Sequence, residues 1–261
     1  PGQSDEELSH RILDRFAAYG GNFLDTADIY GRGLSESIIG PWLQGQRRED
    51  FVVATKCRFN MQSNVNSVGL SRRHITASVE HSLARLHTDY LDLYQTHCFD
   101  SGTPLEETYR TLDDLVRCGK TRYVGVSNVS GWQMQKVVQV QEKLGLNAVV
   151  SLQQQYSLAS RDSELEAFRV CKNEGIGVLA WSPLKGGVLT GKVRRGQRPT
   201  EGRLGWTADD QRRTAQASPF WGNLSDRVFD TIDVAEAIGR RHGMLEAACL
   251  LVFIIIIIIV K

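Results

Sequence analysis

Phe51-Val-Val-Ala-Thr-Lys56 is a short, nearly continuous apolar run that ends in a lysine. Two similar runs lie on either side of it in the sequence, Asn22-Phe-Leu-Asp25 and Tyr90-Leu-Asp-Leu-Tyr-Gln-Thr-His97. Such runs are typical of parallel strands that are covered on both faces. In a parallel α/β barrel, the carboxyl ends of the strands converge on the face where catalysis takes place. The three runs therefore predict a parallel α/β fold that brings Asp25, Lys56 and His97 to one face.

The same alternation continues along the chain. Strand-like runs are separated by segments whose apolar residues recur about every 3.6 positions. Successive strand ends are 26 to 41 residues apart, which is the length of one βα unit. The expected strands are 22–25, 51–56, 89–96, 122–127, 147–153 and 176–182. The expected helices are Glu6–Tyr19, Glu36–Leu43, Arg72–Leu86, Leu105–Val116, Trp132–Leu144, Glu164–Asn173 and Arg227–Arg240.

Capping residues support three of the helix starts. Ser4 is followed by Glu7, and Ser130 is followed by Gln133, each at the three-residue spacing of a capping box. Ser71 directly precedes the third expected helix, where a serine side chain can accept a bond from a free backbone amide. We therefore expect these three serines to cap their helices.

The order of elements predicts a (β/α)8 TIM barrel that forms a single domain over residues 1–261. A doubly wound sheet is the alternative, but it usually shows a glycine-rich G-x-G-x-x-G turn, and this chain has none. That absence favours the barrel. Only six strands are visible, so we expect the first and the last strand to be missing or atypical in this chain.

The overall composition argues against several classes of binding partner, namely nucleic acid, membranes and metal ions. The net charge is +1, which gives no general attraction to nucleic acid or to an anionic membrane. Residues 247–260 form an atypical tail of 14 apolar residues, fewer than the ~18–20 needed to cross a bilayer, so we expect no membrane insertion. The five cysteines form no C-x-x-C pair and no metal-binding spacing with histidine. They predict reduced thiols, a cytoplasmic location and no metal site.

Tyr30 follows the first strand-like run and is the candidate proton donor. A neutral tyrosine is a weak acid with a pKa of about 10, and a nearby ammonium group lowers that pKa. Lys56 is the candidate ammonium, and Asp25 is the carboxylate that would hold it in place. His97 would polarise and orient a carbonyl oxygen, or share the proton. Together the four residues predict protonation of a carbonyl oxygen while hydride reaches the carbon, and positioned acid catalysis of this kind is worth roughly 10²–10⁴ in rate.

Five segments resemble the aldo-keto reductases: "FLDTADIYG" (23–31), "VVATKC" (52–57), "LDLYQTH" (91–97), "YVGVSN" (123–128) and "LAWSPLKGGVLTGK" (179–192). The likeness is strongest over residues 5–205. It is greatest to the branch that contains aryl-alcohol-dehydrogenase-like reductases and potassium-channel β subunits. The resemblance implies a (β/α)8 barrel that binds NADPH, a catalytic tetrad of Asp25, Tyr30, Lys56 and His97, and Tyr30 as the general acid.

The resemblance also implies which residues bind the cofactor. One group matches the residues that hold the nicotinamide, and a second matches those near the pyrophosphate and the other phosphates. The first group is Ser127, Asn128, Gln153 and Trp181, and the second is Ser182, Pro183, Leu184, Gly187, Lys192 and Arg203. The segment that grips the adenosine 2′-phosphate in the family is not recognisable here.

The sequence therefore predicts an NAD(P)H-dependent oxidoreductase of the alcohol dehydrogenase type, which reduces small aldehydes or ketones to alcohols. The alternative is a non-catalytic or weakly catalytic subunit of a larger assembly, as the channel β subunits of the family illustrate. The presence of all four tetrad residues favours the enzyme.

Overall fold

The computed structural model describes residues 4–61, 64–195 and 224–245. They belong to two compact units. The sheet unit comprises Ser4–Gln153 and Glu166–Gly177. The second unit comprises Gln154–Leu165 and the described part of Val178–Lys261.

The strands form one sheet in which the spatial order follows the sequence, β1-β2-β3-β4-β5-β6. The strands are β1 (Phe23–Asp25), β2 (Val52–Cys57), β3 (Leu91–Thr96), β4 (Thr121–Ser127), β5 (Val149–Gln155) and β6 (Gly177–Trp181). The pairings from β1 to β5 are all parallel. Their register places Lys56 beside Gln95 and Ser127 beside Gln153. Polar residues of neighbouring strands are thereby brought together at the carboxyl ends.

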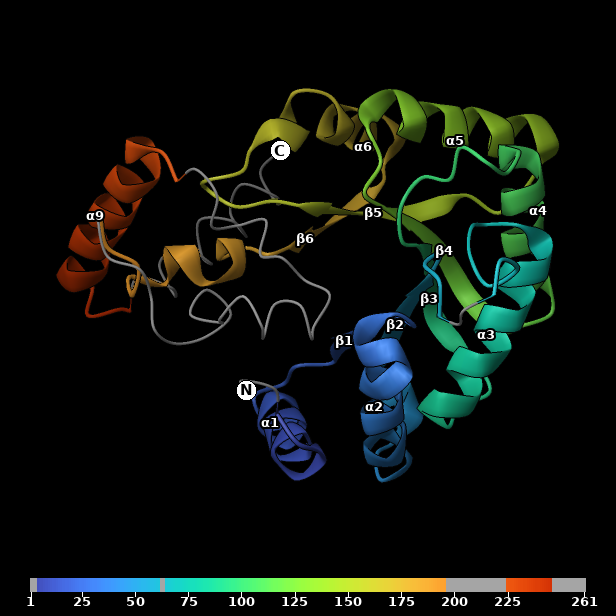
Figure 1. The fold of residues 1–261 in the computed structure, drawn as a ribbon, viewed down its shortest axis with the longest axis horizontal. Coiled ribbons are helices and arrows are strands. Elements are labelled where there is room, and N and C mark those ends of the chain that lie inside the picture. Colours follow the sequence, from blue (N-terminus) through green and yellow to red (C-terminus); the bar gives the residue numbers. More distant parts are fainter. Residues whose placement is uncertain (1–3, 62–63, 196–223, 246–261) are drawn as a thin grey trace. The chain divides into compact units, whose positions relative to one another are not determined.

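Helices alternate with the strands, as parallel pairing requires. The α-helices are α1 (Glu6–Ala18), α2 (Leu34–Gln44), α3 (Arg72–Leu86), α4 (Leu105–Arg117), α5 (Gly131–Leu144), α6 (Ala167–Glu174) and α9 (Asp226–Arg241). The 3-10 helices are η1 (Tyr30–Gly33), η2 (Arg48–Asp50), η3 (Asp162–Glu164) and η4 (Lys185–Thr190). Figure 1 shows α2 to α5 following one another along the outer side of the sheet, and each of these helices contacts the next. This is the α/β order of part of a TIM barrel, as the sequence predicted.

The core of the sheet unit lies between the strands and these helices. Val53, Leu91 and Val126 are fully buried on the strands, and Ile75 on α3 and Leu112 on α4 are buried against them. β2 and β3 are almost completely buried, which explains why their sequences read as continuous apolar runs.

The expected helix caps are partly confirmed. Ser71 Oγ accepts a bond from the His74 amide at 3.3 Å, and the Ser130 amide donates to Gln133 Oε1 at 2.8 Å. At the first helix the expectation was wrong. Asp5, not Ser4, is the cap residue, and its Oδ1 accepts from the Leu8 amide at 2.8 Å. An aspartate caps as well as a serine does, and α1 begins at Glu6, as the apolar periodicity predicted.

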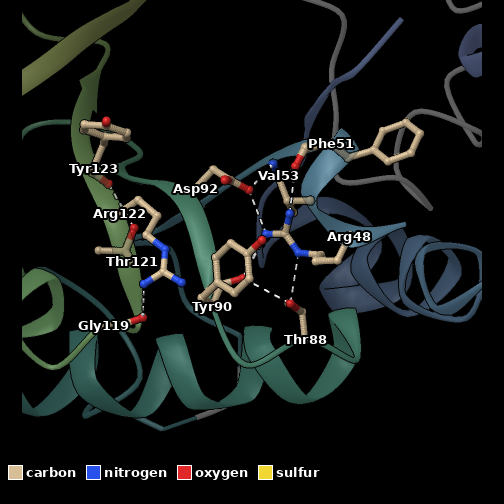
Figure 2. Close-up of polar contacts among 10 residues, drawn as sticks. All are labelled: Arg48, Phe51, Val53, Thr88, Tyr90, Asp92, Gly119, Thr121, Arg122 and Tyr123. Carbon is tan, nitrogen blue, oxygen red and sulfur yellow. Dashed lines mark hydrogen bonds and ion pairs between the residues drawn. The ribbon is translucent and has the colours of Figure 1, made fainter. Parts of the chain in front are cut away.

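A cluster of hydrogen bonds and ring contacts around Arg48 connects the amino ends of β2, β3 and β4, as Figure 2 shows. The Arg48 guanidinium donates to the Phe51 carbonyl at 2.7 Å, to the Tyr90 carbonyl at 3.0 Å and to Asp92 Oδ2 at 2.7 Å. It also stacks on the Tyr90 ring, 4.0 Å from its centroid, and the Arg122 guanidinium lies 4.2 Å from the same centroid. The strand ends opposite the candidate site are thus held by planar stacking and directed hydrogen bonds.

Candidate active site

The four candidate catalytic residues follow three neighbouring strands of the sheet unit. Asp25 ends β1, Lys56 is the penultimate residue of β2, and His97 directly follows β3. Tyr30 begins η1, in which Gly31 and Gly33 have φ values of 59° and 92°. These left-handed conformations suit glycine and allow the chain to turn sharply after the tyrosine.

Lys56 is completely buried and is held by two hydrogen bonds. Its Nζ donates to Asp25 Oδ2 at 2.7 Å and to the Thr26 carbonyl oxygen at 2.7 Å. Burial lowers the pKa of Lys56, and the Asp25 carboxylate opposes this by its charge and its hydrogen bond. The ammonium group is therefore fixed in position.

Tyr30 lies beside the Lys56 ammonium, and His97 lies against Tyr30. The Lys56 Nζ is 5.1 Å from the centroid of the Tyr30 ring, and the Tyr30 and His97 rings meet edge to face with centroids 5.7 Å apart. Tyr30 is 39% exposed, whereas His97 is 9% exposed. Burial lowers the pKa of His97 to about 4, and the charge of Lys56 adds to this effect. His97 is thus neutral near pH 7, and the exposed Tyr30 ring is open to a substrate.

Three of the predicted cofactor residues lie beside this group. Asn128 Nδ2 donates to Ser127 Oγ at 2.9 Å and to the His97 carbonyl oxygen at 2.9 Å. The Asn128 amide donates to the Gln153 carbonyl oxygen at 3.1 Å, and Gln153 Nε2 donates to Asp25 Oδ1 at 2.9 Å. One hydroxyl and two side-chain amides therefore stand at the ends of β4 and β5. They supply the donors and acceptors that a carboxamide group needs, so this part of the site fits a nicotinamide.

Six further predicted cofactor residues belong to the second unit, and only their contacts within that unit are described. Trp181 and Leu184 pack against a core formed by Val188, Leu189, Val193, Ile232 and Ala235. Ser182 has a φ of 52°, and its carbonyl oxygen accepts from the Lys185 amide at 2.8 Å. The Gly187 amide donates to the Leu184 carbonyl oxygen at 3.0 Å. Pro183 is half-buried and Lys192 is exposed, and Arg203 lies outside the described residues.

Two residues that the sequence did not single out lie against the tetrad. Gln95 on β3 is fully buried, and its Nε2 donates to Asp25 Oδ1 at 3.3 Å. Asp28 is 1% exposed, and its charge acts on Lys56. Gln95 could have been found as a polar residue inside an apolar strand. Asp28 lies in a turn, where the sequence gives no sign that it is buried.

This arrangement can deliver a proton from one face of the sheet unit. An exposed phenol next to a fixed buried ammonium is suited to general acid catalysis, because the ammonium stabilises the phenolate that remains. Among the described residues there is no cluster of three histidine, cysteine or acidic side chains that could hold a metal ion. In the same ranges, every helix is too short or too polar to cross a bilayer.

Comparison with known proteins places this geometry in context. The profile of the Aldo/keto reductase family matches residues 1–258. The chain is 42% identical over 201 residues to the uncharacterized oxidoreductase YrpG of Bacillus subtilis, covering 73% of this chain and 61% of that protein. It is 31% identical over 281 residues to the protein tas of Escherichia coli, covering 97% of this chain and 78% of that protein.

A third relative has a different kind of name. The chain is 36% identical over 205 residues to a probable voltage-gated potassium channel subunit beta of Arabidopsis thaliana, covering 77% of this chain and 62% of the plant protein. The chain thus spans about three fifths of the length of YrpG and of the plant protein.

Proposed function

The chain belongs to the aldo/keto reductase family, and we propose that it uses NADPH to reduce small aldehydes or ketones to alcohols, with Tyr30 as the general acid. The family uses nicotinamide cofactors, and the relatives of this chain include proteins named as oxidoreductases. The observation that carries the proposal is the position of Lys56. Its ammonium is buried, bonded to Asp25 and 5.1 Å from the centroid of the Tyr30 ring.

The proposed reaction divides two tasks between cofactor and protein. A bound nicotinamide would supply the hydride that adds to the carbonyl carbon. Tyr30 gives its hydroxyl proton to the carbonyl oxygen, so that hydride and proton together form the alcohol. Lys56 stabilises the phenolate left on Tyr30, and Asp25 keeps Lys56 in place. His97 is neutral and sits edge to face against Tyr30, where its ring can orient the carbonyl oxygen.

The residues that would hold the cofactor follow from the same proposal. The carboxamide would be bound by Ser127, Asn128 and Gln153. Gln153 is hydrogen-bonded to Asp25, Asn128 to the His97 carbonyl oxygen, and Ser127 to Asn128. Trp181 would stack on the nicotinamide ring. The backbone from Ser182 to Gly187 would follow the pyrophosphate, and Lys192 and Arg203 would meet phosphates.

Three further predictions from the sequence belong to this proposal. We propose that residues 1–261 form one barrel domain, that the substrate is a small carbonyl compound and that the protein works in the cytoplasm. The described cysteines Cys57, Cys98, Cys118 and Cys171 are all free thiols, which supports a reducing compartment.

A second candidate function is that of a subunit in a larger assembly, with little or no catalysis. The plant relative named as a probable channel subunit supports this alternative. Size-exclusion chromatography from a native extract distinguishes the two candidates. A subunit migrates with a large complex, whereas the proposed reductase migrates as a small active protein.

The proposed reaction is tested with the purified full-length protein. NADPH binding is followed by fluorescence, and turnover of 4-nitrobenzaldehyde is compared for the wild type and for Tyr30→Phe. We expect Tyr30→Phe to bind NADPH normally and to lose at least about 10²-fold in kcat, because only the proton donor is removed. Tyr123→Phe is the matched control, since Tyr123 is 59% exposed on β4. Equal turnover in the wild type and Tyr30→Phe would contradict the assignment of the acid, and parallel titrations with NADH test the preference for NADPH.

A further inference from the structure

A group of buried polar side chains lies beside Lys56 and has no part in the mechanism above. Glu36 on α2 is fully buried, and its carboxylate accepts from Thr55 Oγ1 at 2.6 Å and from Arg85 Nε at 2.8 Å. Asp28, which follows β1, is 1% exposed. Within the described ranges, neither of its side-chain oxygens has a well-formed hydrogen bond, although the adjacent Ile29 amide acts on the carboxylate. A buried carboxylate of this kind opposes folding, so stability does not account for its presence.

The backbone fixes Asp28 next to β2. Its amide donates to the Lys56 carbonyl oxygen at 3.1 Å, which continues the pairing of this segment with β2 beyond the end of β1. Asp28 and the catalytic lysine are therefore neighbours across two adjacent segments, and the carboxylate acts electrostatically on the ammonium.

Charged and titratable groups face Asp28 from every element around it. They are Lys56 and Cys57 on β2, Tyr94 on β3, Glu36 on α2 and Arg85 on α3. Burial raises the pKa of Asp28 to about 7, the charge of Glu36 adds to this, and the Ile29 amide, Arg85 and Lys56 oppose it. Burial also raises the pKa values of Cys57 and Tyr94, so both keep their protons. Of the neutral acids in this group, Asp28 is the one that gains its charge near neutral pH.

We propose that Asp28 is a positioning residue for the proton that Tyr30 donates: its buried carboxylate holds the Lys56 ammonium and the Tyr30 hydroxyl in their protonated forms as the pH rises. The proposal rests on the proposed function, in which both groups need these protons. A negative charge makes every neighbouring acid hold its proton more tightly, whether that acid is an ammonium or a phenol. Both effects therefore have the same sign.

The consequence is a wider pH range for reduction. Below neutral pH, Asp28 is protonated and has little influence on its neighbours. Above neutral pH the Asp28 carboxylate is charged. In the same pH range, Lys56 and Tyr30 begin to lose their protons. The charge on Asp28 therefore forms in the pH range in which these two groups would otherwise deprotonate. Removing this charge by substitution is expected to affect the alkaline limb of the activity profile more than the acidic limb.

The first test compares kcat/KM for reduction across the pH range in the wild type, Asp28→Asn and Asp28→Glu. We expect the alkaline limb of Asp28→Asn to move to lower pH by about one unit, and Asp28→Glu to restore it. Asp114→Asn on α4 is the matched control for net charge, because Asp114 is exposed and pairs only with exposed Arg72 among the described residues. Coinciding alkaline limbs in the wild type and Asp28→Asn would overturn the proposal.

A second readout does not depend on turnover. The titration of Tyr30 is followed by NMR of protein labelled with ¹³C in its tyrosine rings, and Tyr30→Phe identifies the resonance. Asp28→Asn is expected to lower the Tyr30 midpoint, and Asp28→Ala provides a second variant without the charge. An unchanged midpoint in both variants would refute the role of Asp28. Absence of turnover in the wild type would instead count against the reductase, and the NMR titration would still test Asp28.

Discussion

At the scale of single residues, His97 links the candidate site to the stability of the protein. Its pKa in the folded protein is about 4, whereas an unfolded histidine has a pKa of about 6.5. Between these values the unfolded state binds more protons than the folded state, so the free energy of unfolding falls as the pH falls. This contribution is complete above about pH 6.5 and decreases towards pH 4.

We therefore expect the free energy of unfolding to fall by about 2 kcal/mol between about pH 7 and about pH 5, because His97 takes up a proton in the unfolded state. The measurement is urea unfolding of the wild type and His97→Gln at both pH values. The buried carboxyl of Asp28 has the opposite sign, because its raised pKa means that stability is lost as the pH rises towards 7. The wild type and His97→Gln share the Asp28 effect, so the difference between their losses of unfolding free energy gives the contribution of His97. His81→Gln on the exposed side of α3 is the control, and a wild type that loses no more stability than His97→Gln would contradict the expectation.

The sequence predicted the placement of Asp25, Lys56 and His97 because each ends an apolar run, and parallel strands end on the same side. It did not predict how these residues are connected. Gln153 was assigned to the cofactor alone, yet its amide also donates to Asp25. Gln95 and Asp28 were missed because their roles depend on burial, which arises when segments far apart in the sequence pack together. A pattern of residue types along the chain contains little of that information.

At the scale of elements, the strand runs were located to within a few residues, and β3 was predicted to extend over 89–96 but begins at Leu91. The ends of strands are set by contacts that the periodicity does not contain. Tyr90 is an example, because it was read as part of the strand, but its ring stacks between the guanidinium groups of Arg48 and Arg122. Its carbonyl oxygen accepts from Arg48 instead of pairing in the sheet.

The Arg48 cluster provides a prediction at this scale. Arg48 is only 18% exposed and bonds to groups at the starts of two strands, so its removal leaves the partly buried Asp92 carboxylate without its cation (Figure 2). We expect Arg48→Ala to lower the free energy of unfolding by about 3 kcal/mol. Arg48→Lys is expected to lose about half as much, because an ammonium keeps the charge but lacks the planar stack.

Adjacent Arg47 supplies the control for this experiment. Its side chain is 76% exposed and pairs only with exposed acids in the described part of the chain, so Arg47→Ala is expected to change stability by less than about 0.5 kcal/mol. Chemical unfolding followed by circular dichroism measures all three variants. Similar losses for Arg47→Ala and Arg48→Ala would show that the cluster is not what holds these strand ends.

At the scale of the whole molecule, the two compact units have separate cores. The core of the sheet unit lies between its strands and helices, whereas that of the second unit is built from Val188, Leu189, Val193, Ile232 and Ala235. The sequence predicted one barrel domain from a regular βα spacing. That spacing reports the order of the elements, and the single domain stays a prediction.

The separate cores predict a local response to a cavity in the second unit. Ile232 on α9 is 1% exposed, so Ile232→Ala removes buried methylene and methyl groups and is expected to destabilise its surroundings by about 2–4 kcal/mol. Val234 is two residues away on the same helix and 58% exposed, so Val234→Ala is expected to change stability by less than about 0.5 kcal/mol. Hydrogen exchange followed by mass spectrometry reads the effect segment by segment. The amides of α9 and η4 should exchange faster in Ile232→Ala, while those of β2, β3 and β4 keep their protection. Faster exchange of equal size in the strands would instead mean that both cores unfold as one cooperative unit.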